Sequence, residues 1–421
     1  MKRRLRIFIA ALLALSIAFV LSAAAQSGVD LSQAREIFGE IDSIMQELHE
    51  ITGFKVKHRV PAEIITRDKV KAFIEKRMKE STSPEEIRVE ELTLKKLGLV
   101  PPDFDLQKNT VDLLTEQAAA FYDYHKKRMF ITDWTPSATR EPALVHELGH
   151  ALADQNVNLE KFIKQGQKSD DGSLARLAVM EGQASWLMAE YVARKVGQSL
   201  ANSSELLETM AHTVESGANE FPVFQSEPLY LRVTLVFPYS QGMLFQNAVY
   251  QRMKQQSFEE VFKHPPVSTQ QIIHPDTYFA NLQPAKPALP PPPETHGYKR
   301  IAEGTMGELD HSVLLEQYAG ADESKSLSPH WRGAVYALEE HKSPERVVLL
   351  YAVEWDDAAS ATRYFKDYRK VLEKKFKHAV FESESDTSLA GTGDDGHFLV
   401  QLNGAVVTSV EGAADAVAPA R

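Results

Sequence analysis

Apolar residues recur at helical spacing along much of the front of the chain. They predict one helix over 30–51 and a second over 67–79. A third helix is expected over 83–97, where Ser83 followed by Glu86 has the spacing of a capping box. The front of the chain is therefore predicted to be mainly helical.

The middle of the chain combines a strand-like segment with further helices. Aromatic and β-branched residues on both sides of "HKKR" predict a pair of short strands within 119–134. Two helices are expected after it, over 141–155 and 174–195, with the polar stretch "QGQKSDDGS" leading into the second. This order predicts a hairpin followed by two neighbouring helices.

The last third of the chain has a different pattern. The stretch "PAKPALPPPPET" (284–295) predicts a stiff, extended spacer that cannot join a packed core, with a loop inside one domain as the alternative. Beyond it, "GAVYALEEH" and "RVVLLYAVEW" predict strands, Asp356 is expected to cap a helix, and Asn403-Gly404 predicts a hairpin turn. The predicted fold class is mostly α with small β, divided into a helical region (26–100), a main domain (101–283), a proline-rich linker (284–296) and a small α+β domain (297–421).

The first 25 residues have the layout of a secretory signal peptide. Four basic residues precede an apolar run from Ile7 to Leu21, and small residues then lead to a plausible cleavage point after Ala25. An uncleaved membrane anchor is the alternative, although the run is short for a full span. We therefore expect an exported protein, either periplasmic or secreted.

Composition and charge narrow the classes of partner. The net charge is −11, and it becomes −15 without the basic residues of the leader. An acidic chain without a basic stripe argues against a nucleic-acid partner. The chain has no cysteine, so any metal site must be built from nitrogen and oxygen ligands.

The stretch "ALVHELGHALADQ" (143–155) carries the candidate chemistry. His146 and His150 lie four residues apart on a predicted helix, so they project from the same face. Each neutral imidazole can offer a nitrogen to zinc at about 2.0–2.1 Å. Glu147 occupies the position from which a metallopeptidase glutamate takes a proton from zinc-bound water. This short pattern also occurs by chance on helices, so a third ligand is needed.

A carboxylate on the next predicted helix can be that ligand. Glu181 lies on the apolar stripe of its helix, where a charge is costly unless something compensates it. A zinc ion would do so. A buried salt bridge is the alternative, with Arg176, which lies off the stripe, or with an arginine elsewhere in the chain. The extended pattern with a third histidine is excluded, because Ala153 and Asn156 occupy the positions it needs.

Three neighbouring residues have expected supporting roles. Gly182 and Ala184 are small and would let the two helices approach closely. Asp154 lies one turn after His150 and is interpreted as a carboxylate that orients the ligands, with an exposed helix-end acid as the alternative.

With these residues the chain resembles the zincin superfamily of metallopeptidases, in the branch with a glutamate as third ligand. "HELGH" (146–150) and "EGQA" (181–184) carry the resemblance, although His150 and Glu181 are further apart than in thermolysin-like enzymes. Looser similarity to exported bacterial zincin-like proteins spans about 97–278 and includes "FPYSQGMLF" and "PPVSTQQIIHP". The resemblance implies a zincin-like catalytic domain over 101–283, with zinc held by His146, His150 and Glu181.

The resemblance also suggests where a substrate binds. The strand pair around 122–133 would line the cleft and offer backbone groups to an extended peptide, with plain core sheet as the alternative. Tyr239 and His274 are the candidate donors to the oxyanion. The prolines beside them suggest rigid loop positions, and a buried structural role is the alternative for each.

These observations together predict an exported zinc metallohydrolase. We expect a peptidase that acts on peptides or proteins with Glu147 as general base. A non-catalytic zincin-like scaffold for binding or envelope assembly is the alternative, and an amidase acting on cell-wall peptides is a second enzyme class. Membrane contact is expected only through an uncleaved leader. The C-terminal domain has no recognisable catalytic set and is expected to bind a partner or flank the cleft.

Overall fold

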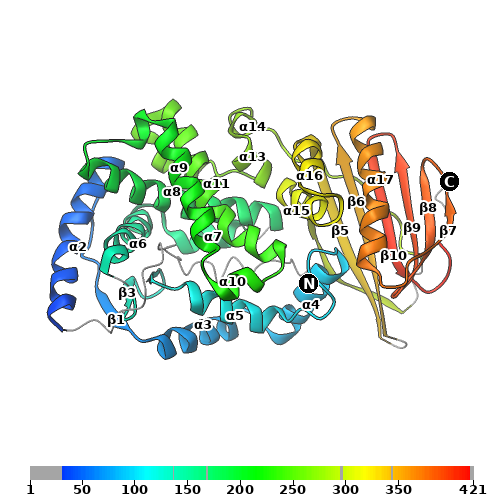
Figure 1. The fold of residues 1–421 in the computed structure, drawn as a ribbon, viewed down its shortest axis with the longest axis horizontal. Coiled ribbons are helices and arrows are strands. Elements are labelled where there is room, and N and C mark those ends of the chain that lie inside the picture. Colours follow the sequence, from blue (N-terminus) through cyan, green and yellow to red (C-terminus); the bar gives the residue numbers. More distant parts are fainter. Residues whose placement is uncertain (1–30, 136, 167–168, 294–296, 343–344, 418–421) are drawn as a thin grey trace.

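The fold comes from a computed structural model, which describes residues 31–135, 137–166, 169–293, 297–342 and 345–417. Figure 1 shows an elongated molecule with most helices at one end and a large sheet at the other. The fold class is confirmed at this coarse level, as mostly α with a separate antiparallel sheet towards the C-terminus. The predicted signal peptide, 1–25, lies outside the described residues. Within the described ranges, none of the helices combines the length and the apolar character that a membrane span needs.

The described chain begins with helices that agree with the sequence pattern. They are α2 (Leu31–Thr52), α3 (Arg67–Ser81), α4 (Pro84–Lys96) and the additional α5 (Leu106–Gln117). The Oγ of Ser83 accepts the backbone N–H of Glu86, and the Glu86 carboxylate accepts the N–H of Ser83 at 2.8 Å. The predicted capping box at the start of α4 is therefore confirmed.

A small three-stranded sheet lies among these helices. Its strands are β1 (Ala62–Ile65), β2 (Ala120–Asp123) and β3 (Arg128–Thr132), in the order β1-β3-β2. The predicted pair, β2 and β3, is antiparallel. Its turn forms without a glycine. Asp123 accepts the N–H groups of His125 and Lys126, and Lys127 takes the positive φ of 51°.

Strand β1 is an addition to the region 26–100, which was predicted to be mainly helical and for which no strand was expected. It pairs in parallel with β3, from Ala62 opposite Met129 to Ile65 opposite Thr132. Four residues are too few to display the two-residue period of a strand, which is why the pattern did not reveal it.

Three long helices form the centre of the helical end: α6 (Ser137–Val157), α8 (Asp170–Lys195) and α11 (Leu229–Met253). Helix α8 contacts both of the others. A Cβ at Gly182 would overlap the backbone of Gly242 in α11, whereas Gly149 of α6 faces Ala184. Ala184 therefore lets α6 and α8 approach, as predicted, but Gly182 serves the contact with α11 instead.

Shorter helices surround this centre. They are α7 (Leu159–Gly166), α9 (Ser204–Ala218), α10 (Pro222–Ser226), α12 (Ser257–Lys263), α13 (Thr269–Ile273) and α14 (Pro275–Phe279). Helix α8 begins earlier than predicted, because Ser169 caps it by accepting the N–H of Gly172.

The described residues of the C-terminal part form a seven-stranded antiparallel sheet and three α-helices. The strand order is β4-β5-β6-β10-β9-β8-β7, and Figure 1 shows α15 and α17 beside this sheet. The strands are β4 (Tyr298–Thr305), β5 (Trp331–Lys342), β6 (Glu345–Trp355), β7 (Val380–Glu384), β8 (Ser388–Gly393), β9 (Gly396–Asn403) and β10 (Val406–Ala413), and the helices are α15 (Glu308–Ala319), α16 (Ala321–Leu327) and α17 (Ala358–Lys375). An α+β arrangement was predicted, but β4, β7, β8, α15 and α16 were not.

Two local predictions in this part have different outcomes. The cap of α17 is Asp357, which accepts the N–H of Ser360 at 2.7 Å, whereas the predicted Asp356 bonds with His330. The pattern "DD" could not tell these neighbours apart. The hairpin is confirmed, since Asn403 pairs with Val406 across a turn in which Gly404 has a φ of 59°.

The predicted linker, 284–296, lies against the sheet over its described residues. Ala285 donates its N–H to the carbonyl of Arg332 at 2.8 Å, and Leu289 packs on a buried cluster that includes Ala337 and Leu350. The expectation that this segment cannot join a packed core is therefore wrong. Its prolines cannot donate hydrogen bonds, but the alanine and leucine between them can pair and pack.

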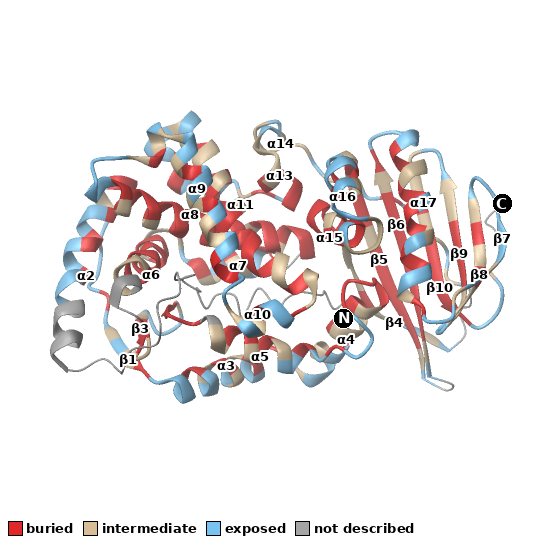
Figure 2. Cartoon of the chain, in the orientation of Figure 1, coloured by how far each residue is buried: buried red, intermediate tan, exposed pale blue. Residues whose placement is uncertain are grey.

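Helix α4, in the predicted N-terminal region, also contacts the predicted C-terminal domain. The ammonium of Lys96 lies 2.6 Å from the carboxylate of Asp395, and Arg88 pairs with Glu340 at 2.8 Å. Figure 2 shows buried positions continuing from the helical end into the sheet, and one cluster of buried apolar residues extends from α2 to β10. The two ends of the molecule therefore share a core.

Candidate metal centre

Three predicted ligands meet in the core of the helical end. His146 and His150 project from α6, and Glu181 projects from the middle of α8. The two histidine Nε2 atoms are 3.2 Å apart, and Glu181 Oε2 lies 3.1 Å from His146 Nε2 and 3.2 Å from His150 Nε2. No more than 3% of any of these residues is exposed. The structure thus brings the three together as a buried group that could hold a metal ion.

The spacing of the three donor atoms suits a tetrahedral ion. Ligands at about 2.0–2.1 Å from such an ion are separated from one another by about 3.3 Å. The observed separations of 3.1–3.2 Å are close to that value. In addition, Glu181 Oε1 is buried and has no hydrogen-bond partner among the described residues.

Burial and charge together set the protonation of the group. Burial lowers the pKa of His146, because an imidazolium would lose its hydration in the core. For Glu181 burial acts in the raising direction, but the neighbouring histidines outweigh it and hold the pKa at about 2. An ionised carboxylate beside a neutral imidazole is the state that metal binding requires.

Arg176 does not neutralise Glu181. Its guanidinium donates to the carbonyl of Phe162 at 3.2 Å and lies over the Phe162 ring, 4.7 Å from the centroid. Within the described ranges, the ion pairs of Glu181 are with the two histidines alone. The salt-bridge alternative therefore finds no support in the structure.

Glu147 is fully buried and is held by the small sheet. Its Oε2 accepts the backbone N–H of Tyr122 at 2.8 Å. Tyr122 belongs to β2, which is an edge strand, so this N–H points away from β3 and towards α6. One of the edge groups predicted to meet a peptide is thus bonded to Glu147 in this structure.

Asp154 connects α6 to the same hairpin. Its Oδ2 accepts hydrogen bonds from the Tyr122 hydroxyl at 2.9 Å and the Lys127 ammonium at 2.6 Å, and its Oδ1 accepts the N–H of Leu159. Asp154 is buried, so the exposed-acid alternative is wrong. In the described part of the chain it bonds with the hairpin rather than with the histidines, and Tyr122 links it to Glu147 by hydrogen bonds.

The sequence did not reveal the roles of Tyr122 and Lys127. The alternation along 120–123 could have predicted that the Tyr122 N–H points to one edge of the strand. It could not have predicted at which edge the neighbouring strand lies. That choice depends on the sheet order, in which β1 makes β3 the central strand.

Tyr239 lies beside the ligands, but on a helix rather than on the predicted loop. Its ring stacks on that of His146, with 5.8 Å between centroids and 24° between planes. Pro238 lies inside α11, which is buried on most sides and so shows no single apolar stripe. A buried helix of this kind gives no amphipathic pattern, and its proline misleadingly indicated a loop.

His274 lies apart from this group, between α13 and α14. Its Nε2 donates to Glu308 Oε1 of α15 at 2.9 Å, and 37% of its side chain is exposed. This hydrogen bond raises the pKa of His274, while partial burial opposes the shift. Among the described residues His274 joins the helical end to the C-terminal part and does not contact the ligand group.

Comparison with known proteins yields one family match. Residues 294–420 match a family described as "Domain of unknown function (DUF8575)". The match covers less than a third of the chain, excludes the metal-ligand group and names no activity. No curated protein and no solved structure matches the chain.

Proposed function

We propose that this protein is a zinc-dependent metallohydrolase that cleaves peptide bonds. The observation that carries the proposal is the buried triangle of His146 Nε2, His150 Nε2 and Glu181 Oε2, with the buried carboxylate of Glu147 on the same helix turn. A structural metal site has no need of this second carboxylate, whereas hydrolysis needs a base beside the metal.

The donor set favours zinc. Two imidazoles and one carboxylate are the ligands of a catalytic zinc site that keeps its fourth position open, and the chain offers no thiolate for a softer metal. A zinc ion at this position supplies Lewis acidity, which lowers the pKa of water and polarises a carbonyl group.

The side chains of the protein then have separate tasks. Glu147 accepts the proton of the attacking water and passes it to the leaving amine. The Tyr122 N–H fixes one oxygen of Glu147 at 2.8 Å, and Asp154 fixes Tyr122 through its hydroxyl. Tyr239, next to His146, is the candidate donor to the oxyanion. His274 is no longer a candidate for that task in this proposal, because its hydrogen bond goes to Glu308.

The fold and the location of the protein form part of the proposal. A short sheet whose edge strand faces a ligand-bearing helix, followed by a second helix with a glutamate ligand, supports a zincin-like catalytic domain. The leader pattern in residues 1–25 supports export to the periplasm or the medium.

One observation favours a second candidate function. His146, Glu147, His150 and Glu181 are all almost completely buried, which is typical of a metal that stabilises a fold rather than of one that meets a substrate. A non-catalytic scaffold with a structural metal is therefore the alternative.

Zinc content tests the proposal first. We expect about one zinc per chain in the purified protein after mild dialysis, and a large loss of zinc in Glu181→Ala. Glu190→Gln is the matched control, because Glu190 is a buried carboxylate of the same helix that bonds with Arg194 and Ser199 instead. Absence of zinc from the wild type, even after zinc is supplied, would refute both candidates. Zinc without hydrolysis of casein or of purified peptidoglycan would favour the scaffold.

A further inference from the structure

A second candidate site lies where the helical end meets the C-terminal part. A cavity of about 490 Å³ opens between α11 on one side and α15 and α16 on the other. Its apolar lining includes Phe224, Val233, Phe237 and Leu309. This volume is within the range of small-ligand pockets, and such pockets typically combine an apolar lining with a few polar groups.

One end of the cavity carries a buried carboxylate with spare bonding capacity. Glu308 is only 1% exposed, and its Oε1 accepts the hydrogen bond of His274. Its Oε2 is buried without a hydrogen-bond partner among the described residues. A buried carboxylate oxygen in this situation favours a ligand that brings a hydrogen-bond donor.

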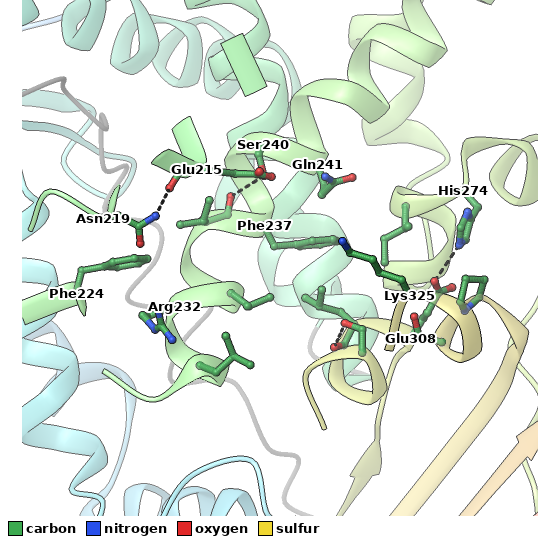
Figure 3. A pocket seen from close by; sticks show the side chains of 18 residues that line it. Glu215, Asn219, Phe224, Arg232, Phe237, Ser240, Gln241, His274, Glu308 and Lys325 are labelled. Carbon is green, nitrogen blue, oxygen red and sulfur yellow. Dashed lines mark hydrogen bonds and ion pairs between the residues drawn. The ribbon is translucent and has the colours of Figure 1, made fainter. Parts of the chain in front are cut away.

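The other end carries a guanidinium in the complementary situation. Figure 3 shows Arg232 beside Phe224, at the far side of the cavity from Glu308 and His274. The Nε of Arg232 is buried and has no acceptor within the described part of the chain. Lys325 extends from α16, on the side of Glu308, towards Phe237, and its positive charge lies between Glu308 and Arg232 in the view of Figure 3. An anionic group between Arg232 and the Lys325 ammonium would satisfy both charges.

We propose that this cavity binds a short apolar peptide with free ends, whose amino group bonds with Glu308 and whose carboxylate bonds with Arg232 and Lys325. A molecule of this class supplies the donor, the anion and the apolar body that the three parts of the cavity favour. Because the lining comes from both ends of the molecule, the bound peptide also holds α11 and α15 together.

The site is separate from the metal centre. The cavity lining includes Ser240 and Gln241 of α11, but neither Tyr239 nor any of the three metal ligands. The proposal therefore does not depend on zinc or on peptide hydrolysis.

Calorimetry of the full chain with the dipeptide phenylalanyl-leucine tests the proposal. In a Glu147→Gln background the hydrolysis proposed above would fall at least about 100-fold, so little of the peptide would be consumed during the titration. We expect saturable binding, with a loss of at least about tenfold in affinity when the peptide is N-acetylated or when its carboxylate is amidated. A Glu181→Ala chain should bind the peptide equally well, which distinguishes this site from the metal centre.

Paired substitutions assign each end of the peptide. Arg232→Gln should weaken binding of the free peptide at least about tenfold, and amidation of the peptide should then cause no further loss. Glu308→Gln should also weaken binding at least about tenfold, and N-acetylation should then cause no further loss. Lys325→Gln, at an exposed position, should weaken binding without affecting folding. Arg252→Gln, on α11 but outside the lining and paired with Asp276, is the matched control and should bind normally.

Two results would overturn the proposal. One is the absence of saturable binding in the wild type at millimolar peptide. The other is binding that the Arg232, Glu308 and Lys325 variants leave unchanged, since the peptide would then bind elsewhere. Thermal unfolding of each variant separates a lost contact from a lost fold.

Discussion

The two ends of the molecule each contain buried histidines, but the surroundings of those histidines differ. In the C-terminal part, His311 donates its Nδ1–H to the carbonyl of Gly307 at 2.7 Å and accepts the Tyr351 hydroxyl at Nε2 at 2.6 Å. Tyr364 lies 2.9 Å from the Tyr351 oxygen and can donate to it. Both ring nitrogens of His311 therefore have protein partners.

In the helical end the same kind of side chain has a different partner. His146 and His150 turn their Nε2 atoms towards each other and towards the ionised Glu181. Protons could satisfy only part of this triangle, whereas a cation at its centre contacts all three lone pairs. A buried histidine by itself therefore does not indicate a metal site. The groups that face its ring nitrogens determine whether the site favours a hydrogen-bond network or a cation.

Removal of the proposed base should have the largest effect. Glu147→Gln should reduce peptide hydrolysis by at least about 100-fold, because a positioned proton acceptor contributes that much or more. Zinc content should stay near that of the wild type, as Glu147 is not a ligand in the proposal. Glu141→Gln on the same helix, where Glu141 pairs with Lys195 at the surface, should keep full activity. Equal activity of the two variants would remove Glu147 from the mechanism.

Metal removal should lower the thermal stability that depends on the His146–His150–Glu181 group and leave the contribution of His311 unchanged. Free zinc at 100 to 1,000 times its dissociation constant stabilises a protein by about 3–4 kcal/mol, so a chelator should lower the melting temperature of the wild type. The chelator should have no effect on Glu181→Ala and a full effect on His311→Gln. A full effect on Glu181→Ala would place the metal elsewhere.

Disruption of the C-terminal network should affect stability alone. Tyr351→Phe leaves His311 Nε2 and the Tyr364 hydroxyl without their shared partner, which should cost about 2 kcal/mol in the free energy of unfolding. Tyr278→Phe loses a hydrogen bond to the His264 carbonyl near the surface and should cost less. Denaturant titration measures both costs, and zinc content should stay the same in the two variants.

The pair of His274 and Glu308 should give the smallest effect, and a pH-dependent one. Since the folded pKa of His274 is raised, its contribution is complete below the unfolded pKa of about 6.5 and is lost as the pH rises through the folded value. The side chain is partly exposed, so we expect no more than about 0.5 kcal/mol. The difference in unfolding free energy between wild type and His274→Gln should shrink from about pH 6 to about pH 8. A difference that grows with pH would contradict the assignment.

The grouping of the candidate ligands could be predicted because local rules determine it. Helical spacing places His146 and His150 on one face, and the apolar stripe turns Glu181 into the core. The neighbouring contacts could not be predicted in the same way. Tyr239 lies in a helix without an apolar stripe, and β1 gains its structure only from pairing with β3. The partners of Asp154 belong to a hairpin whose position depends on the whole sheet.

The packed linker and helix α4 have a practical consequence for protein production. The matched family segment begins at residue 294, yet a chain shortened to that point would lack Leu289, which packs on the sheet, and Lys96, which pairs with Asp395. Apolar strand positions such as Ala337 and Leu350 would lose part of their cover and favour aggregation. Soluble expression of the C-terminal part therefore calls for supplying α4 and residues 284–293 with it.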